Sequence, residues 1–196
     1  MPKVTEQYRE AKREEIAAAA LRCFAKKGFG ASMADIIAET GLSAGAIYGH
    51  FASKQEVMLA VAQNLMGNRV EDMRILSSFE RAPSPGEVVA AVLTSLAAEV
   101  TDTGLMLQVW GGSLNDPGIR DIVDEVFAEL RNAYVPLFAA WAQQNRGLDE
   151  AAAREWASAL VPVSLALGQG YIVQSALSSD FDADAYLASV RELLPH

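Results

Sequence analysis

Apolar residues recur along this chain at the spacing of an α-helix. The first such stripe predicts a helix over 8–27, ended by Gly28, and consists of Ile16, Ala20, Cys23 and Phe24. Cys23 shares the apolar face, so we expect a buried core thiol. Alanine, leucine and glutamate are abundant and strand-like alternation is scarce. The pattern therefore predicts an all-α fold of about nine helices.

Serine residues mark the starts of the next three helices. Ser32 can cap a helix that stops at Thr40, and Ser43 can cap a second short helix over 44–51. Ser53 begins a capping box that opens a long helix to about residue 77. Two short helices are therefore expected with a tight turn over 41–43 between them.

Capping residues and prolines also mark the helices in the remainder of the chain. Ser84-Pro85-Gly86-Glu87 is another capping box with proline at the first helical position. Pro136 and Pro162 lie inside predicted helices, where each is expected to cause a kink. The helices predicted after residue 84 cover about 85–100, 104–113, 117–145, 149–178 and 182–194.

The two short helices have the features of a helix-turn-helix. Gly41 supplies the turn, and the apolar residues for the helix crossing are Ile36, Ile37, Leu42 and Ile47. Small residues on the second helix leave it slim enough to approach a major groove. An ordinary pair of packed helices would show much of the same pattern, so these features alone leave both interpretations open.

The stretch ADIIAETGLSAGAIYGHFASK, residues 34–54, resembles the DNA-binding signature of the tetracycline-repressor (TetR) family of bacterial transcription regulators. The preceding FAKKGF, residues 24–29, resembles the end of that family's first helix. Ile37 departs from the family, which often has alanine there. The resemblance implies a three-helix DNA-binding domain over 1–55, with its motif at about 33–52, and a helical ligand-binding and dimerisation domain over 56–196.

The resemblance also implies roles for individual residues. The start of the second helix faces a phosphate, the start of the third faces base edges, and the residues after it contact phosphates. The residues concerned are, in that order, Ser32 and Met33; Ser43, Ala44, Gly45 and Ala46; and Tyr48, His50 and Lys54. For His50 and Lys54 a merely solvated side chain is the alternative. Because the third helix lacks Arg, Gln and Asn, we expect specificity to depend also on DNA shape and on an N-terminal arm with Lys3, Arg9, Lys12 or Arg13.

Charge divides the chain into two parts. The net charge is −9, but residues 1–54 carry eight basic and six acidic side chains, and residues 55–196 carry eight and nineteen. One cysteine excludes an internal disulfide, and two histidines argue against a metal cluster, so no cofactor is expected. The polar N-terminus and the short apolar runs predict neither a signal peptide nor a membrane span, and hence a cytoplasmic protein.

The acidic part is expected to hold a small effector. Its aromatic and methionine side chains suit an apolar, aromatic or amphiphilic ligand, although a helical stripe of this kind is more often core. The residues proposed for ligand binding are Arg69, Met73, Met106, Trp110, Phe127, Tyr134, Phe138, Tyr171 and Gln174. Gln108 is a further candidate for a polar contact.

The last two helices are apolar on more than one face, and Gly168 and Gly170 permit close helix approach. We interpret them as half of a homodimer interface, with a single central helix of a monomer as the alternative. A two-fold dimer requires a palindromic, double-stranded DNA operator with half-sites one turn apart.

The resulting prediction is a repressor that its effector releases from DNA. The alternatives are a helical sensing module without operator binding and an all-helical enzyme. The absence of a recognisable nucleophile, acid–base pair or metal cluster argues against the enzyme.

Overall fold

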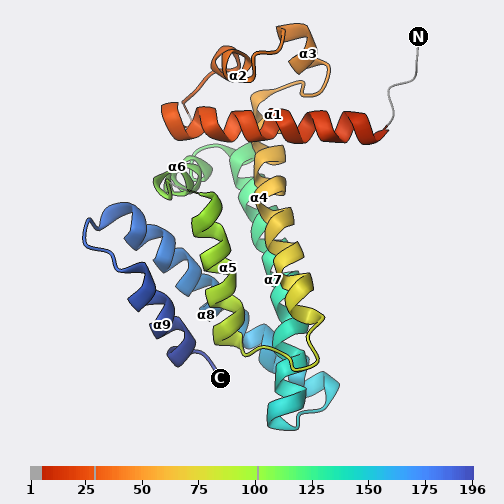
Figure 1. Ribbon diagram of the computed structural model, residues 1–196, viewed down its shortest axis with the longest axis vertical. Helices are drawn as coiled ribbons and strands as arrows, with labels where there is room; N and C mark the ends of the chain where they lie inside the picture. Colours follow the sequence, from red (N-terminus) through yellow and green to blue (C-terminus); the bar gives the residue numbers. More distant parts are fainter. Residues whose placement is uncertain (1–5, 29, 101) are drawn as a thin grey trace. The chain divides into compact units, whose positions relative to one another are not determined.

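A computed structural model of the chain describes residues 6–28, 30–100 and 102–196, apart from the side chains of residues 65–72 and 74 (Figure 1). This described part is all-α, as predicted. Its helices are α1 (Glu6–Lys27), α2 (Met33–Thr40), α3 (Ala44–Tyr48), α4 (Lys54–Ser77), α5 (Pro85–Glu99), α6 (Gly104–Ser113), α7 (Pro117–Arg146), α8 (Glu150–Leu177) and α9 (Ala183–Leu193).

Most predicted helix ends agree with the structure to within two residues, and α3 is the exception. It ends at Tyr48 instead of residue 51, because Gly49 caps it. The amides of His50 and Phe51 both donate to the Ile47 carbonyl and close the last turn. The predicted helix therefore continues as a tight turn that leads towards α4.

Contacts divide the chain into two compact units. One comprises residues 1–65 and 108–124, and the other comprises residues 66–107 and 125–196. Consequently α4, α6 and α7 each contribute residues to both units. The predicted boundary between a DNA-binding domain ending at residue 55 and a ligand-binding domain starting at residue 56 stays a prediction.

The first unit is built on a small apolar core to which each of the first four helices contributes. Figure 1 shows α2 and α3 on the same side of α1. The larger side chains at 0% exposure in this core are Ile16, Phe24, Ile36, Ile47, Phe51 and Val57. Burying a side chain of this size contributes roughly 1.5–3 kcal/mol, so this core dominates the stability of the unit.

Local capping sets the ends of α2 and α3. Ser32 and Asp35 form a capping box at the start of α2, and the Ser43 hydroxyl accepts from the Ala46 amide at the start of α3. Gly41 ends α2 with φ +67°, a left-handed conformation that favours glycine. The chain thus turns sharply enough for Ile36 and Ile47 to meet in one core.

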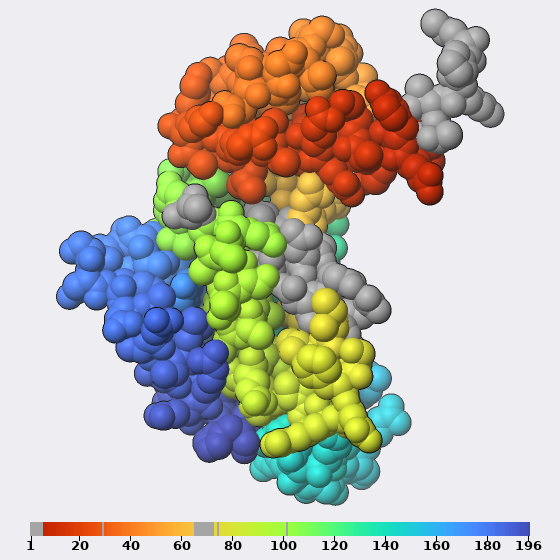
Figure 2. All heavy atoms as spheres, viewed as in Figure 1, coloured from red at the N-terminus to blue at the C-terminus, as the bar shows by residue number. Residues whose placement is uncertain are grey.

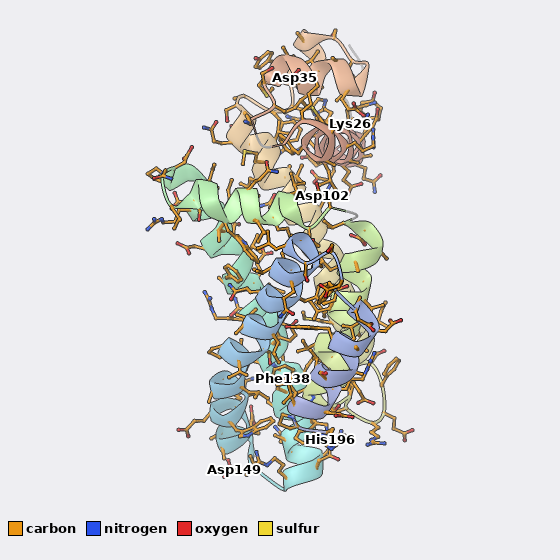
Figure 3. All side chains as sticks on the ribbon, turned by 90° about the vertical axis from the view of Figure 1, so that its left-hand side faces the viewer. Lys26, Asp35, Asp102, Phe138, Asp149 and His196 are labelled. Carbon is orange, nitrogen blue, oxygen red and sulfur yellow. The ribbon has the colours of Figure 1, made fainter. Side chains whose placement is uncertain are left out.

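Ion pairs connect α1 with α2 at the surface. Lys26 Nζ lies 2.8 Å from Glu39 Oε1, and Lys27 Nζ lies 2.6 Å from Asp35 Oδ1; Figure 3 labels Lys26 and Asp35 on their two helices. The hydrogen bonds from Lys27 and from the Ser32 cap hold the pKa of Asp35 far below its ordinary value. The hydrogen bond from Lys26 likewise lowers the pKa of Glu39.

In the second unit α5 packs closely against α9 and also contacts α8 (Figures 1 and 2). Val88, Val89 and Val190 are at most 1% exposed in this contact region. A Cβ at Gly86 would lie 2.8 Å from the Arg191 carbonyl oxygen, so the two helices approach closely because residue 86 has no side chain.

Three aromatic rings secure α8 to the segment that carries α9. Tyr171 makes edge-on contacts with Phe181 and Tyr186 at centroid distances of 5.2 and 5.6 Å. The Tyr186 hydroxyl donates to the Leu167 carbonyl at 2.8 Å. A Cβ at Gly170 would lie 2.7 Å from that hydroxyl oxygen, so this glycine makes the contact possible.

We expect Gly86→Ala to lower the free energy of unfolding by about 1–3 kcal/mol, because the new methyl group meets backbone that cannot rotate away. Urea unfolding monitored by circular dichroism measures this change. Gly111→Ala in α6 is the control, since nothing lies within 4 Å of its Cβ position and alanine favours a helix. Equal stability of the two variants would contradict the close approach.

Asp35→Asn is expected to lower the melting temperature at pH 7. The folded-state pKa of Asp35 is depressed, so its stabilisation is present above the ordinary value near 3.8 and is lost as the pH falls further. The difference from wild type should therefore shrink between pH 4 and pH 2.5. Thermal melts across this range test the prediction, with Glu10→Gln on exposed α1 as the control; a pH-independent difference would refute it.

Candidate functional site

The outer face of α3 carries only small side chains and one aromatic ring. Ala44, Gly45 and Ala46 are exposed, and no atom lies within 4 Å of a Cβ built on Gly45. Tyr48 is 53% exposed. This face lets backbone and methyl groups approach another surface closely, with a hydroxyl at its end.

Arg13 braces the segment that follows α3. Its guanidinium donates to the His50 carbonyl and lies 4.2 Å from the centre of the Phe51 ring. Arg13 therefore makes its contacts within the unit, whereas the sequence placed it among the candidates for an N-terminal arm that contacts DNA. Lys12 pairs with Glu15 at 2.6 Å, Arg9 is on an exposed part of α1, and Lys3 lies outside the described residues.

His50 is half-buried at the end of this turn. Its Nδ1 atom is buried and has no hydrogen-bond partner among the described residues. Lys54 is half-buried at the first position of α4. Both residues belong to the same unit as α3, so the structure keeps the predicted phosphate contacts in one compact part of the chain.

The start of α2 is occupied by a carboxylate of the chain itself. Asp35 Oδ2 accepts from the Ser32 amide at 2.8 Å and from the Ser32 hydroxyl at 2.6 Å. Ser32 is exposed and Met33 half-buried. The negative charge reduces the attraction of this helix end for a phosphate, and Lys27 offsets it by pairing with the same side chain.

The residues predicted to bind a ligand differ in burial and in their described contacts. Tyr134 and Phe138 are buried against each other at a ring distance of 5.3 Å, and burial raises the pKa of Tyr134. Tyr171 belongs to the aromatic contact with α9. Met106, Trp110 and Phe127 are half-buried, Gln174 is exposed, the Arg69 side chain lies outside the described residues, and Met73 lines a cavity.

That cavity has a volume of about 320 Å³ and lies within the second unit. One side is formed by the end of α4 and the following loop, and the other by α7. The lining residues are Met73, Leu76, Ser77, Phe79, Ala82, Pro83, Ala133, Pro136, Leu137, Ala140 and Gln144. The α7 members form a stripe at helical spacing that contains small residues, which a search for bulky side chains passes over.

Gln108 lies in the first unit, close to the end of α1. Its Oε1 atom would be 2.7 Å from a Cβ at Gly28, which has φ +72°. This position places Gln108 in the same unit as the helix-turn-helix, and its predicted contact with a ligand stays a prediction. The reason for the placement is tertiary, because α6 contributes residues to both units.

The described residues include neither a cluster suited to a metal ion nor an exposed cysteine. No group of three or more His, Cys, Asp or Glu side chains there is arranged to hold a metal ion. Cys23 is buried, and burial raises the pKa of its thiol, which disfavours a reactive thiolate.

Helix α8 is long and apolar enough, by length and composition, to cross a membrane. The sequence prediction considered unbroken apolar runs, whereas mean hydropathy over a window tolerates the polar residues of α8. Buried helices of soluble proteins pass this test too, so the property by itself is weak evidence for a membrane span. Within the unit, α8 contacts α5 and α9.

Comparisons with known proteins agree with the first unit's architecture. Residues 16–61 match the model of bacterial regulatory proteins of the tetR family. The chain is 31% identical over 144 residues to the HTH-type transcriptional repressor AcnR of Corynebacterium glutamicum, which covers 71% of this chain and 61% of AcnR. It is 35% identical to the Bacillus subtilis regulator YerO over 40% of this chain and 27% of YerO. It is 28% identical to the Bacillus subtilis regulator YfiR over 74% of this chain and 59% of YfiR.

Solved structures share the fold over nearly the whole chain. GusR of Salmonella enterica superposes with a TM-score of 0.67 at 20% identity, covering 97% of this chain and 96% of GusR. FadR of Bacillus subtilis, solved in complex with stearoyl-CoA, superposes with a TM-score of 0.66 at 19% identity, covering 92% and 96%. The matched relatives are named as regulators and not as enzymes. Residues 16–61 thus match the DNA-binding domain of the tetR family, and the all-helical chain is similar to bacterial transcription regulators.

Proposed function

We propose that the protein is a cytoplasmic repressor that binds a palindromic operator as a homodimer and is released by a small, largely apolar effector. The observation that carries this proposal is the capped α2–Gly41–α3 unit with its slim exposed face. Such a face has no role in packing within the unit, since Ile36 and Ile47 are the residues buried there. It is suited to entering a major groove.

Contacts to bases would be made mainly by methyl groups and backbone. Ala44 and Ala46 are exposed at the start of α3, where they can contact thymine methyl groups. Apart from Tyr48, which we propose for a phosphate, the α3 residues offer no long hydrogen-bonding side chain to a base. We therefore infer that sequence selection depends partly on the shape and deformability of the operator.

Phosphate contacts would be few. Lys12, Lys26 and Lys27 pair with acidic side chains of the first unit, and Arg13 bonds to the chain itself. Tyr48 and Lys54 are the residues that we propose for the phosphates beside α3. Few neutralised phosphates release few counterions, so operator binding should weaken only gradually with salt.

The dimer would form through α8 together with α9. Ala159, Pro162, Val163 and Ala166 are exposed on α8 at spacings of three and four residues, and Val163 is 51% exposed. An apolar helical stripe open to solvent is stabilised when a second copy covers it. This use of the stripe accounts for the high hydropathy of α8 without a membrane.

The effector would act through the helices that belong to both units. A ligand in the second unit that binds preferentially to one conformation of α4 or α7 would stabilise that conformation. The recognition helices α3 of the dimer would then change position. The coupling is reciprocal, so operator must weaken effector binding by the same factor. FadR of Bacillus subtilis, which shares this fold, was solved with stearoyl-CoA, and this supports an effector here with apolar parts.

The operator can be selected from random duplex DNA with refolded protein. On the enriched palindrome, Lys54→Ala and Tyr48→Phe should each weaken binding about tenfold, and by similar factors on non-cognate DNA, because each removes a phosphate contact. Lys54→Ala should also make the salt dependence shallower. Gln143→Ala on exposed α7 is the control. Failure to enrich any sequence at low salt would favour a sensing module without operator binding.

Val163→Asp should convert the dimer to a monomer at micromolar concentration, because it places a charge in the proposed apolar interface. Sedimentation velocity measures the mass, and circular dichroism checks that the monomer remains helical. Gln143→Asp is the matched control on α7. A wild-type protein that is already monomeric under these conditions would refute the dimer.

A further inference from the structure

The cavity at the far end of α4 has the size of a small-molecule site. Its volume of about 320 Å³ is near the lower end of the roughly 300–1,000 Å³ that ligand pockets occupy. All its lining residues belong to the second unit. In Figure 2 the end of α4 and the loop after it lie beside the second half of α7.

The sequence of α7 creates this space. Ala133 and Ala140 line the cavity with side chains too short to fill it. Pro136 lies between them and has no amide hydrogen to donate to the Asn132 carbonyl. This turn of α7 therefore has one helical hydrogen bond fewer and can be reshaped more easily than a regular turn.

The wall carries no charged side chain among the described residues. Its larger members are apolar, and Ser77 and Gln144 are polar. None of the described lining residues can pair with an ion, and apolar surroundings without a partner of opposite charge disfavour an ion. The lining consequently favours a neutral, mostly apolar molecule.

Gln144 supplies a directional polar contact. Its Oε1 atom accepts from the Ala82 amide at 2.9 Å, and this bond identifies the other terminal atom as the NH₂ nitrogen. That nitrogen is a donor of hydrogen bonds and cannot accept them. A ligand atom that pairs with it must be an acceptor such as a carbonyl oxygen.

Phe79 lies at the cavity with much of its surface in water. Its side chain is 55% exposed, although it also lines the cavity. A ligand that covers part of this ring would gain favourable burial of apolar surface. Phe79 thus provides an aromatic contact beside the donor of Gln144.

We propose that this cavity is the effector site, and that it takes a small neutral molecule with an apolar body and a hydrogen-bond acceptor, such as a ketone or an ester. The assignment rests on the proposed function and makes it specific. Met73 and Leu76 connect the site with α4, the helix that begins at Lys54 beside α3. Occupancy would be communicated through that continuous helix.

The test uses Prodan, a neutral fluorescent naphthyl ketone, and its analogue dimethylaminonaphthalene, which lacks the carbonyl. Gln144→Glu keeps an acceptor for the Ala82 amide and removes the donor from the cavity. Ala140→Phe fills the space. Gln143→Glu is the control for the first variant, since Gln143 is exposed and is not among the lining residues.

Fluorescence titration should show that Prodan binds the wild-type protein. Gln144→Glu should weaken Prodan roughly tenfold and the analogue less than threefold, because only Prodan has the acceptor. Ala140→Phe should weaken both ligands at least tenfold, and Gln143→Glu neither. Absence of Prodan binding, or equal affinity in wild type and Ala140→Phe, would overturn the assignment. The Gln144→Glu result remains decisive if Ala140→Phe does not fold.

Operator binding of the same proteins, measured separately, distinguishes the two proposals. If the protein binds the operator but not Prodan, the proposed repressor function is supported and the assignment of the cavity is refuted. If Prodan binds with the expected variant pattern but no operator is found, the cavity is supported as a ligand site and the proposed repressor function is refuted. If both bind, saturating Prodan should lower operator affinity at least fivefold; unchanged affinity would overturn the cavity as the effector site.

Discussion

The small apolar core of the first unit is the interaction on which the helix-turn-helix depends. Each of the first four helices buries at least one side chain completely in it, and the turn at Gly41 is what allows Ile36 and Ile47 to reach the same core. Once these side chains are buried, the opposite face of α3 has to be exposed. Arg13 then secures the following segment through the His50 carbonyl and the Phe51 ring.

Charge and shape have separate roles in this unit. All three lysines of α1 pair with acidic side chains, and the pairs of Lys26 and Lys27 connect α1 with α2 at the surface. Little of the basic excess is therefore left for phosphates. Because α3 is slim, close approach can replace long polar side chains in contacting a groove. For the proposed operator binding, close fit would therefore contribute more than long-range attraction.

The second unit distributes its apolar residues among three environments. Tyr134, Phe138 and Tyr171 pack against other rings and form core. A stripe on α8 stays exposed, and the space between α4 and α7 stays unfilled because alanine and proline line it. Three of the aromatic residues predicted to bind a ligand are thus packed against other rings, while small residues line the cavity.

The sequence by itself determined the helices, their caps and the helix-turn-helix, because these depend on residues that are close along the chain. Ser32 with Asp35, Gly41 and Ser84 with Glu87 all adopt the local geometry that their spacing predicts. Only the tertiary structure decided which apolar residues are core and which line space, as Phe138 and Ala140 show. Periodicity identifies the face of a helix, but the partner of that face depends on contacts between distant segments, such as Gln144 with Ala82.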